Sequence, residues 1–127
     1  ALCFGVQSCA IRVDNRRLMC WGSDTFGKST PPKDVQFRQI SSGNTFSCGI
    51  SLDGSLYCWG DDRQGQSSPP PGKYTLVSCG FEHACALRVP KDYENKAGST
   101  IEGEVVCWGN YADGRVNAPR NGIFKWV

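Results

Sequence analysis

Eight cysteines are the residues of this chain whose chemistry is easiest to foresee. Cys3 lies six residues before Cys9, and Cys79 lies six residues before Cys85. Such a cysteine density in 127 residues is typical of disulfide-stabilised proteins from an oxidising compartment, so we expect an extracellular or cell-surface protein. The other six cysteines form three pairs whose second member begins a Cys-Trp-Gly tripeptide: Cys9 with Cys20, Cys48 with Cys58, and Cys85 with Cys107.

Other groups that could carry out catalysis or bind a metal are scarce. His83 is the only histidine, and its spacing from Cys79 and Cys85 departs from that of zinc sites. No nucleophile lies in a recognisable turn, and no glycine-rich phosphate loop lies between a strand and a helix. We therefore expect no enzymatic activity, no metal and no cofactor.

Two further residue types recur close to the Cys-Trp-Gly tripeptides. The acidic residues that follow them lack the alternating oxygen ligands of a calcium loop, so we interpret them as turn and cap residues. The tryptophans are interpreted as packing between repeats, with a sugar-binding platform as the alternative. Trp126 does not belong to a Cys-Trp-Gly tripeptide and is a candidate interface residue. The acidic residues are Asp24, Asp61, Asp62 and Asp113, and the tryptophans are Trp21, Trp59 and Trp108.

Charge and hydropathy exclude two classes of partner. The net charge of +2 is too small to indicate binding to nucleic acid or to an anionic membrane surface. The sequence also has no apolar run of the length that spans a bilayer.

Alignment on the three Cys-Trp-Gly tripeptides shows an internal repeat of about 38 residues. Each tryptophan is followed six residues later by a glycine, then by prolines and a short apolar stretch. We expect one repeat domain over residues 1–127, with repeats at about 1–40, 41–77 and 78–127. The third repeat carries an insertion at 89–105.

Each repeat predicts three short antiparallel strands, and the middle repeat shows the pattern best. A three-residue loop at 52–54 with glycine last is typical of a β-hairpin. Its register sets Ile50 opposite Leu56 and Cys48 opposite Cys58, where a disulfide is sterically possible. The same logic pairs the cysteines of the first and third repeats, with the insertion as a longer hairpin tip. The sequence thus predicts an all-β fold.

The stretch "SSGNTFSCGISLDGSLYCWGDDRQGQSSPPPGKYTLVSCGFEHACAL" resembles the short, cysteine-bearing form of the regulator-of-chromosome-condensation repeat. The resemblance implies β-propeller blades, as in the ectodomains of Crinkly-type plant receptor kinases and in microbial surface proteins. Repeat one departs from the pattern at Phe4 and Lys28, and repeat three at Arg115. The activity of the nuclear members on a small GTPase is not implied, because their repeats are longer and lack the cysteine pairs.

Three blades do not close a propeller, which usually has four to eight. The fold is therefore expected to be a partial propeller or one completed by other chains, either as two copies in a six-bladed ring or as a head-to-tail array. The C-terminal "FKWV" matches "FRQI" and "YTLV", so the last strand is expected to complete a blade of another copy. Cys3 and Cys79 could pair with each other, but partners outside these repeats are favoured.

These observations favour a secreted, non-enzymatic module for protein binding or extracellular assembly. Binding is assigned to the insertion, with Tyr93 as an aromatic anchor beside Lys91, Asp92 and Glu94. The alternatives are a structural subunit of an extracellular filament or surface layer, and a sugar-binding propeller. The expected partners are another protein, further copies of the chain or a glycan.

Overall fold

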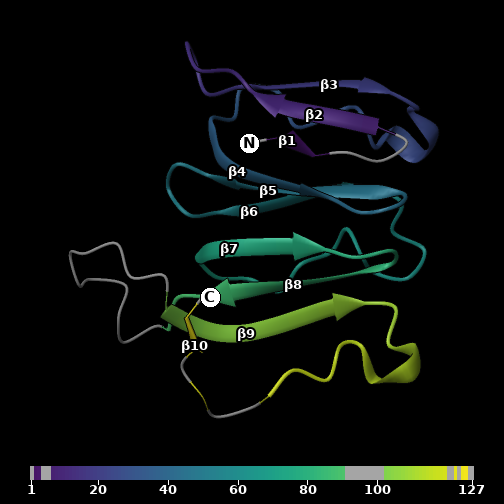
Figure 1. The fold of residues 1–127 in the computed structure, drawn as a ribbon, viewed down its shortest axis with the longest axis vertical. Helices are drawn as coiled ribbons and strands as arrows, with labels where there is room; N and C mark the ends of the chain where they lie inside the picture. Colours follow the sequence, from purple (N-terminus) through teal and green to yellow (C-terminus); the bar gives the residue numbers. More distant parts are fainter. Residues whose placement is uncertain (1, 4–6, 91–101, 120–121, 123, 126–127) are drawn as a thin grey trace.

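Three small antiparallel sheets are stacked along the long axis of the protein (Figure 1). The first strand of the second and of the third sheet begins in the last residues of the preceding sequence repeat. The computed structural model describes residues 2–3, 7–90, 102–119, 122 and 124–125. The strands are β1 (Leu2–Cys3), β2 (Gln7–Ile11), β3 (Leu18–Gly22), β4 (Phe37–Ser42), β5 (Phe46–Ser51), β6 (Leu56–Gly60), β7 (Tyr74–Cys79), β8 (His83–Arg88), β9 (Glu102–Gly109) and β10 (Phe124–Lys125). Among the described residues, no helix is long or apolar enough to cross a membrane.

The second strand and the third strand of each sheet form the hairpin that carries the cysteines. In β5 and β6, Cys48 lies opposite Cys58 and Ile50 lies opposite Leu56, which is the register that the sequence predicts. A disulfide joins the two strands at this point in all three sheets, with the Cα atoms 4.1 Å apart. The bridges are Cys9–Cys20, Cys48–Cys58 and Cys85–Cys107.

The glycine of each Cys-Trp-Gly tripeptide ends the third strand with a sharp change of direction. Gly60 and Gly109 have φ values of 108° and 105°, a region that L side chains rarely adopt. A Cβ at Gly60 would also lie 2.6 Å from the carbonyl oxygen of Thr45, and a Cβ at Gly109 would lie 2.6 Å from that of Glu82. Only glycine fits at this position for both reasons.

The apolar core lies between the blades and is divided into two clusters. One cluster fills the junction of the first and second blades and contains Cys9, Ile11, Leu18, Cys20, Val35, Phe37, Ile40 and Trp59. The other fills the junction of the second and third blades and contains Phe46, Cys48, Ile50, Leu56, Cys58, Tyr74, Val77, Cys79, Ala84, Ala86, Val106 and Trp108. Both apolar clusters of the described residues therefore lie between neighbouring blades.

The first strand of the first blade is one residue out of step with its counterparts. Cys3 pairs with Cys9 itself, whereas the matching residues Ser42 and Cys79 pair with the residue before the cysteine. In the second and third blades the next residue is glycine, and a Cβ on Gly43 would lie 2.4 Å from the carbonyl oxygen of Gly80. The first repeat has Phe4 instead of glycine at this place in the sequence.

The third sheet has a fourth strand, β10, which differs from the expected pattern of three strands. Phe124 pairs with Gly103 and Lys125 with Glu102 at the start of β9. The same contact occurs where the chain leaves the second blade, since Lys73 bridges Ser55 just before β7 begins. In the sequence match, Phe124 and Lys125 correspond to Tyr74 and Thr75 at the start of β7, but here they pair with the start of β9 in the third blade.

Removal of the bridge in the middle blade should weaken the fold measurably. In the double variant Cys48→Ala/Cys58→Ala, we expect the free energy of unfolding to fall by about 3 kcal/mol, because the bridge closes a loop of about ten residues. Urea denaturation followed by circular dichroism measures this change. The matched variant Cys85→Ala/Cys107→Ala should lose slightly more, since its loop is about twice as long. A loss below 1 kcal/mol in both would contradict a stabilising role.

Candidate functional site: the two open blade faces

A tryptophan of each later blade donates a hydrogen bond to the blade before it. The indole Nε1 of Trp59 donates to the carbonyl oxygen of Lys28 at 3.0 Å, and that of Trp108 donates to the carbonyl oxygen of Gln66 at 2.9 Å. Both side chains are buried, with 8% and 6% of their surface exposed. The acceptor in each case follows the glycine that recurs six residues after the tryptophan, so the repeat itself positions donor and acceptor.

In the first blade, the tryptophan in the equivalent position is Trp21, which lies on an exposed face of the blade. Trp21 is 53% exposed, and the neighbouring Met19 on the same strand is exposed to the same extent. No described residue covers them. The face that the second and third blades bury against a neighbour is therefore presented to solvent by the first blade.

A large aromatic residue at the start of β4 and at the start of β7 fills the space between two blades. Phe37 is buried at the first junction, where its ring lies close enough to Gly49 that a Cβ there would be 2.7 Å away. Tyr74 is buried at the second junction, and its hydroxyl donates to the carbonyl oxygen of Pro70 at 2.6 Å. Phe124 holds the matching place in the sequence after the third blade.

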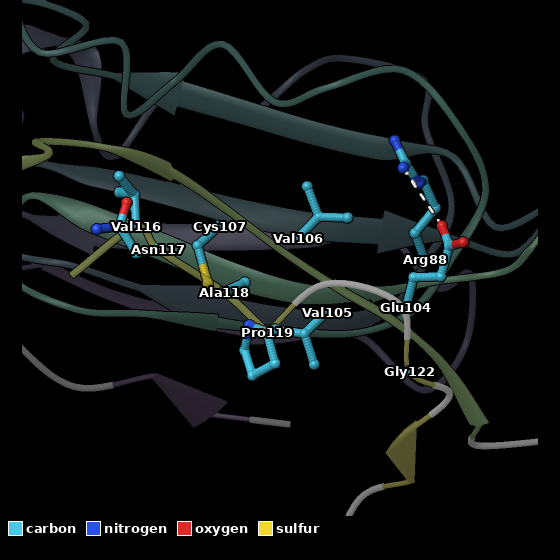
Figure 2. A pocket seen from close by; sticks show the side chains of 10 residues that line it. All are labelled: Arg88, Glu104, Val105, Val106, Cys107, Val116, Asn117, Ala118, Pro119 and Gly122. Carbon is cyan, nitrogen blue, oxygen red and sulfur yellow. Dashed lines mark hydrogen bonds and ion pairs between the residues drawn. The ribbon is translucent and has the colours of Figure 1, made fainter. Parts of the chain in front are cut away.

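On the third blade, the surface that corresponds to these filled junctions is a groove of about 720 Å³ (Figure 2). Val105 and Cys107 of β9 form one wall, and Val116 to Pro119 lie across from them. The ion pair between Arg88 and Glu104 lies at one end. In the second blade the matching residues Leu56 and Cys58 are packed against the cluster that contains Tyr74. Among the described residues, this groove therefore lies where a neighbouring blade packs at the two internal junctions.

Polar side chains of the first strands join neighbouring blades close to the propeller axis. The amide of Gln39 accepts from the backbone N–H of Val77 at 3.1 Å, and the hydroxyl of Ser41 accepts from the N–H of Cys79 at 2.9 Å. The thiol of Cys79 donates to the carbonyl oxygen of Ser41 at 3.4 Å. Sequence reasoning missed Gln39 and Ser41. The available signal was that these two polar residues alternate along β4, a strand that otherwise faces the core.

The acidic residues after the tryptophans fix the loops that supply the carbonyl acceptors. Asp24 accepts from the N–H of Ser29 and the hydroxyl of Thr30, and Asp62 accepts from Ser67 and Ser68 in the same way. This is the turn-and-cap role that the sequence predicts. The described residues contain no group of three or more His, Cys, Asp or Glu side chains that could hold a metal ion. The side chain of Asp113 lies outside the described part.

Asp61 is a buried carboxylate at the base of the loop that leads to Gln66. It accepts two hydrogen bonds from the guanidinium of Arg63, at 2.9 and 2.7 Å, and further ones from the Arg63 N–H and the Thr45 hydroxyl. The bonds from Arg63, aided by those from the backbone and Thr45, lower the pKa of Asp61 from 3.8 to about 2, against the opposing effect of burial.

The remaining predicted site residues fall into two groups. Lys91, Asp92, Tyr93 and Glu94 of the insertion lie outside the described residues, as does Trp126, so their binding role stays a prediction. His83 is partly buried at the start of β8, where its ring lies against Gly80. The side chain of Cys3 is also outside the described part, and its pairing stays a prediction as well.

The indole bond can be tested with two matched variants. Trp59→Phe should lower the free energy of unfolding by about 1 kcal/mol, because it removes the indole donor and leaves the buried Lys28 carbonyl with only the longer bond from the Ser47 hydroxyl, at 3.5 Å. Trp21→Phe should change it by less than about 0.5 kcal/mol, since the Trp21 ring is largely exposed. Both values come from urea denaturation. Equal effects of the two substitutions would show that the bond to Lys28 does not hold the junction.

The lowered pKa of Asp61 predicts a specific loss of stability in acid. A carboxylate whose pKa is lower in the folded protein stabilises it fully above the unfolded value of 3.8, and this contribution is lost as the pH falls through about 2. Asp61→Asn removes the contribution. We expect the stability gap between wild type and variant to narrow by about 1–2 kcal/mol from pH 5 to pH 2, as measured by urea denaturation at each pH. Parallel pH curves would contradict this assignment.

Comparison with known proteins places this geometry among propeller repeats. The family profile of the regulator of chromosome condensation (RCC1) repeat matches residues 37–66, which span β4 to β6 and the start of the loop that follows. The CRINKLY WD40 ectodomain of the Arabidopsis thaliana receptor kinase ACR4 superposes with a TM-score of 0.73 at 25% identity, over 95% of this chain and 40% of that one. The entire ectodomain of the Physcomitrella patens receptor kinase CR4 gives 0.62 at 29% identity, over 82% and 26%.

One further solved structure shares the fold alone. Yeast RCC1 (Prp20), in its complex with Kap60, superposes with a TM-score of 0.68 at 21% identity, over 90% of this chain and 33% of that one. The chain spans less than half the length of each of these proteins. It contains an RCC1 repeat at residues 37–66 and folds as three blades of an RCC1-like β-propeller.

Proposed function

We propose that this chain is a non-enzymatic propeller module that acts outside the cell by binding another protein or by assembling with further blades. One observation carries the proposal: three disulfide-bridged hairpins make a rigid stack whose polar groups are used in turns and blade junctions. Rigid scaffolds of this kind present binding residues on the loops between their strands.

The disulfides and the resemblance to two receptor ectodomains support an extracellular location. Each bridge joins adjacent strands of one hairpin, an arrangement that persists only where thiols are oxidised. The two ectodomains belong to receptor kinases, and their location is carried over to this chain as part of the proposal.

The insertion is the proposed binding element for a protein partner. It joins β8, which ends at Arg88, to β9, which begins at Glu102, so it extends the tip of a hairpin whose other end is fixed by the Cys85–Cys107 bridge. Tyr93 is the proposed aromatic anchor, with Lys91, Asp92 and Glu94 beside it.

Two alternatives differ in their support. A structural subunit of a filament or surface layer is favoured by the two open faces, one at each end of the stack. A sugar-binding propeller is less well supported, because Trp59 and Trp108 are buried and cannot offer a ring face to a glycan. Of the three tryptophans in phase with the repeat, only Trp21 is exposed enough to do so.

The role of the insertion is testable by site-specific photocrosslinking. A photoreactive phenylalanine analogue at position 93 should crosslink a protein when the chain is presented to intact cells of its source. The same analogue at Val13, a hairpin tip that is 92% exposed, is the control and should not. Equal crosslinking at both positions, or none at 93, would count against the insertion as the binding element.

Deletion of residues 91–102 gives an independent test. Because loop length changes stability only slowly, the free energy of unfolding should stay within about 1 kcal/mol of the wild-type value. Crosslinking is then replaced by a cell-binding assay with a fluorescently labelled chain, in which the deletion should abolish the signal. Retention of cell binding by a folded deletion variant would refute the assignment.

A further inference from the structure

We propose that the groove between β3 and the segment that follows it, at the hairpin tip of the first blade, binds an acidic segment of a protein partner in extended conformation. That segment adds to β3 as a fourth strand of the blade, and Arg16 and Lys33 hold its carboxylates. The proposal rests on the protein-binding role given above and adds to it a second site, which does not use the insertion.

The groove has a volume of about 420 Å³, and every residue that lines it belongs to the described part of the first repeat. Leu18 and the prolines at 31 and 32 supply apolar surface, and Lys33 supplies positive charge. Leu18 also packs against the cluster at the first junction, whereas Trp21 lies on the opposite face of the same strand. The second blade leaves the groove open, and a blade packed on the Trp21 face would leave it open as well, so the site does not depend on what precedes residue 1.

The positive charges at this hairpin tip are not all balanced. Arg17 is neutralised by Asp34, with 3.1 Å between the guanidinium and the carboxylate. Arg16 and Lys33 are both exposed, and neither forms an ion pair with another described residue. Two positive charges are therefore left to attract an anionic partner.

Arg16 holds a backbone conformation that favours glycine. Its φ is 60°, and the matching residue in the second blade is Gly54, with a φ of 89°. The main chain shows the match, since the carbonyl of Arg16 accepts from Phe37 N–H at 2.7 Å and that of Gly54 from Tyr74 N–H at 2.9 Å. This conformation costs stability in any residue with a Cβ, and such strained positions concentrate at binding sites.

The free edge of β3 favours a peptide over other polyanions. Among the described strands, β3 pairs only with β2. The Cα atoms of Cys9 and Cys20 are 4.1 Å apart, which is the spacing of a pair that exchanges no main-chain hydrogen bonds. The N–H and C=O groups of Cys20, and of Leu18 two residues earlier, therefore point away from β2, and no described residue bonds to them. An extended peptide can pair with these donors and acceptors together.

Charge complementarity identifies the side chains of that peptide as acidic. A strand that pairs with Leu18 reaches both cations, because Arg16 lies two residues before Leu18 and Lys33 lines the same groove. The outer strand of the second blade, β6, is also at the edge of its sheet. There the tip cation Lys73 is already paired with Asp53 at 3.5 Å, so the second blade lacks the uncompensated charge.

The test uses a fluorescein-labelled octapeptide of alternating glutamate and valine, and fluorescence polarisation measures its binding to the full chain. Arg16→Gly and Lys33→Ala should each weaken the affinity about tenfold, since each removes one charge-assisted hydrogen bond. Lys73→Ala removes a cation that is already paired, and this matched control should change the affinity by less than about twofold. Added salt should weaken binding to the wild-type chain.

The stability of Arg16→Gly separates a binding role from a structural one. Because a φ of 60° suits glycine, the variant should unfold at the same urea concentration as wild type or at a higher one. Loss of peptide binding by a variant that is at least as stable is the expected result. A variant that is less stable than wild type, or that binds the peptide equally well, would overturn the assignment of Arg16.

Two further peptides test the charge and the strand pairing. Replacement of glutamate by glutamine, and N-methylation of every residue of the acidic peptide, should each weaken binding roughly tenfold or more. Equal binding of the methylated peptide would overturn the proposal, and so would polygalacturonate that competes as well as the unlabelled peptide. Both results would indicate a surface that binds any polyanion.

Failure of this site is distinguishable from failure of the insertion. Deletion of residues 91–102 should leave binding of the acidic peptide unchanged, although it is expected to abolish cell binding. A wild-type chain that does not bind the acidic peptide at millimolar concentration would overturn the present proposal and would not affect crosslinking at position 93.

Discussion

An indole N–H that donates across a buried junction to a main-chain carbonyl holds each blade against the one before it. The bonds from Trp59 to Lys28 and from Trp108 to Gln66 lie within the two apolar clusters, where a lost partner is costly because water cannot replace it. The chain around these bonds is shaped so that the indole and the carbonyl oxygen stay paired. The Cys-Trp-Gly glycine turns the chain away from the strand, and Asp24 and Asp62 fold the acceptor loops.

Disulfides stabilise each hairpin, whereas the indole bonds hold neighbouring hairpins together. The bridges fix the register within a hairpin, so that the tryptophan next to the second cysteine points to the preceding blade. The indole bonds and the aromatic residues Phe37 and Tyr74 then fix one hairpin against the next. Because both apolar clusters of the described residues lie between blades, each blade is stabilised by its neighbour, as in other repeat proteins.

Features that depend on a few adjacent residues could be predicted from the sequence. The hairpin at 52–54 fixes the register of Cys48 and Cys58 by local geometry alone, and the repeat period extends that register to the other blades. Features that depend on contacts between blades could not. The bonds that Gln39 and Ser41 make to β7 arise only when two sheets meet. The one-residue shift of β1 against β2 could not be predicted either, because the repeat period implies the same register in all three blades. The sequence also marks Lys28 as a departure from the repeat pattern, although its place in the structure is the regular one.

The position of Lys28 determines which part of a repeat must stay the same for two blades to pack. The bond at each junction is made to the backbone oxygen of residue 28 or 66, so lysine and glutamine can both supply it. Their side chains are nevertheless buried, and Lys28 also donates to the carbonyl oxygen of Asn44 in the second blade. A duplicated repeat therefore brings the acceptor with its main chain, while the side chain at this position must still fit the junction.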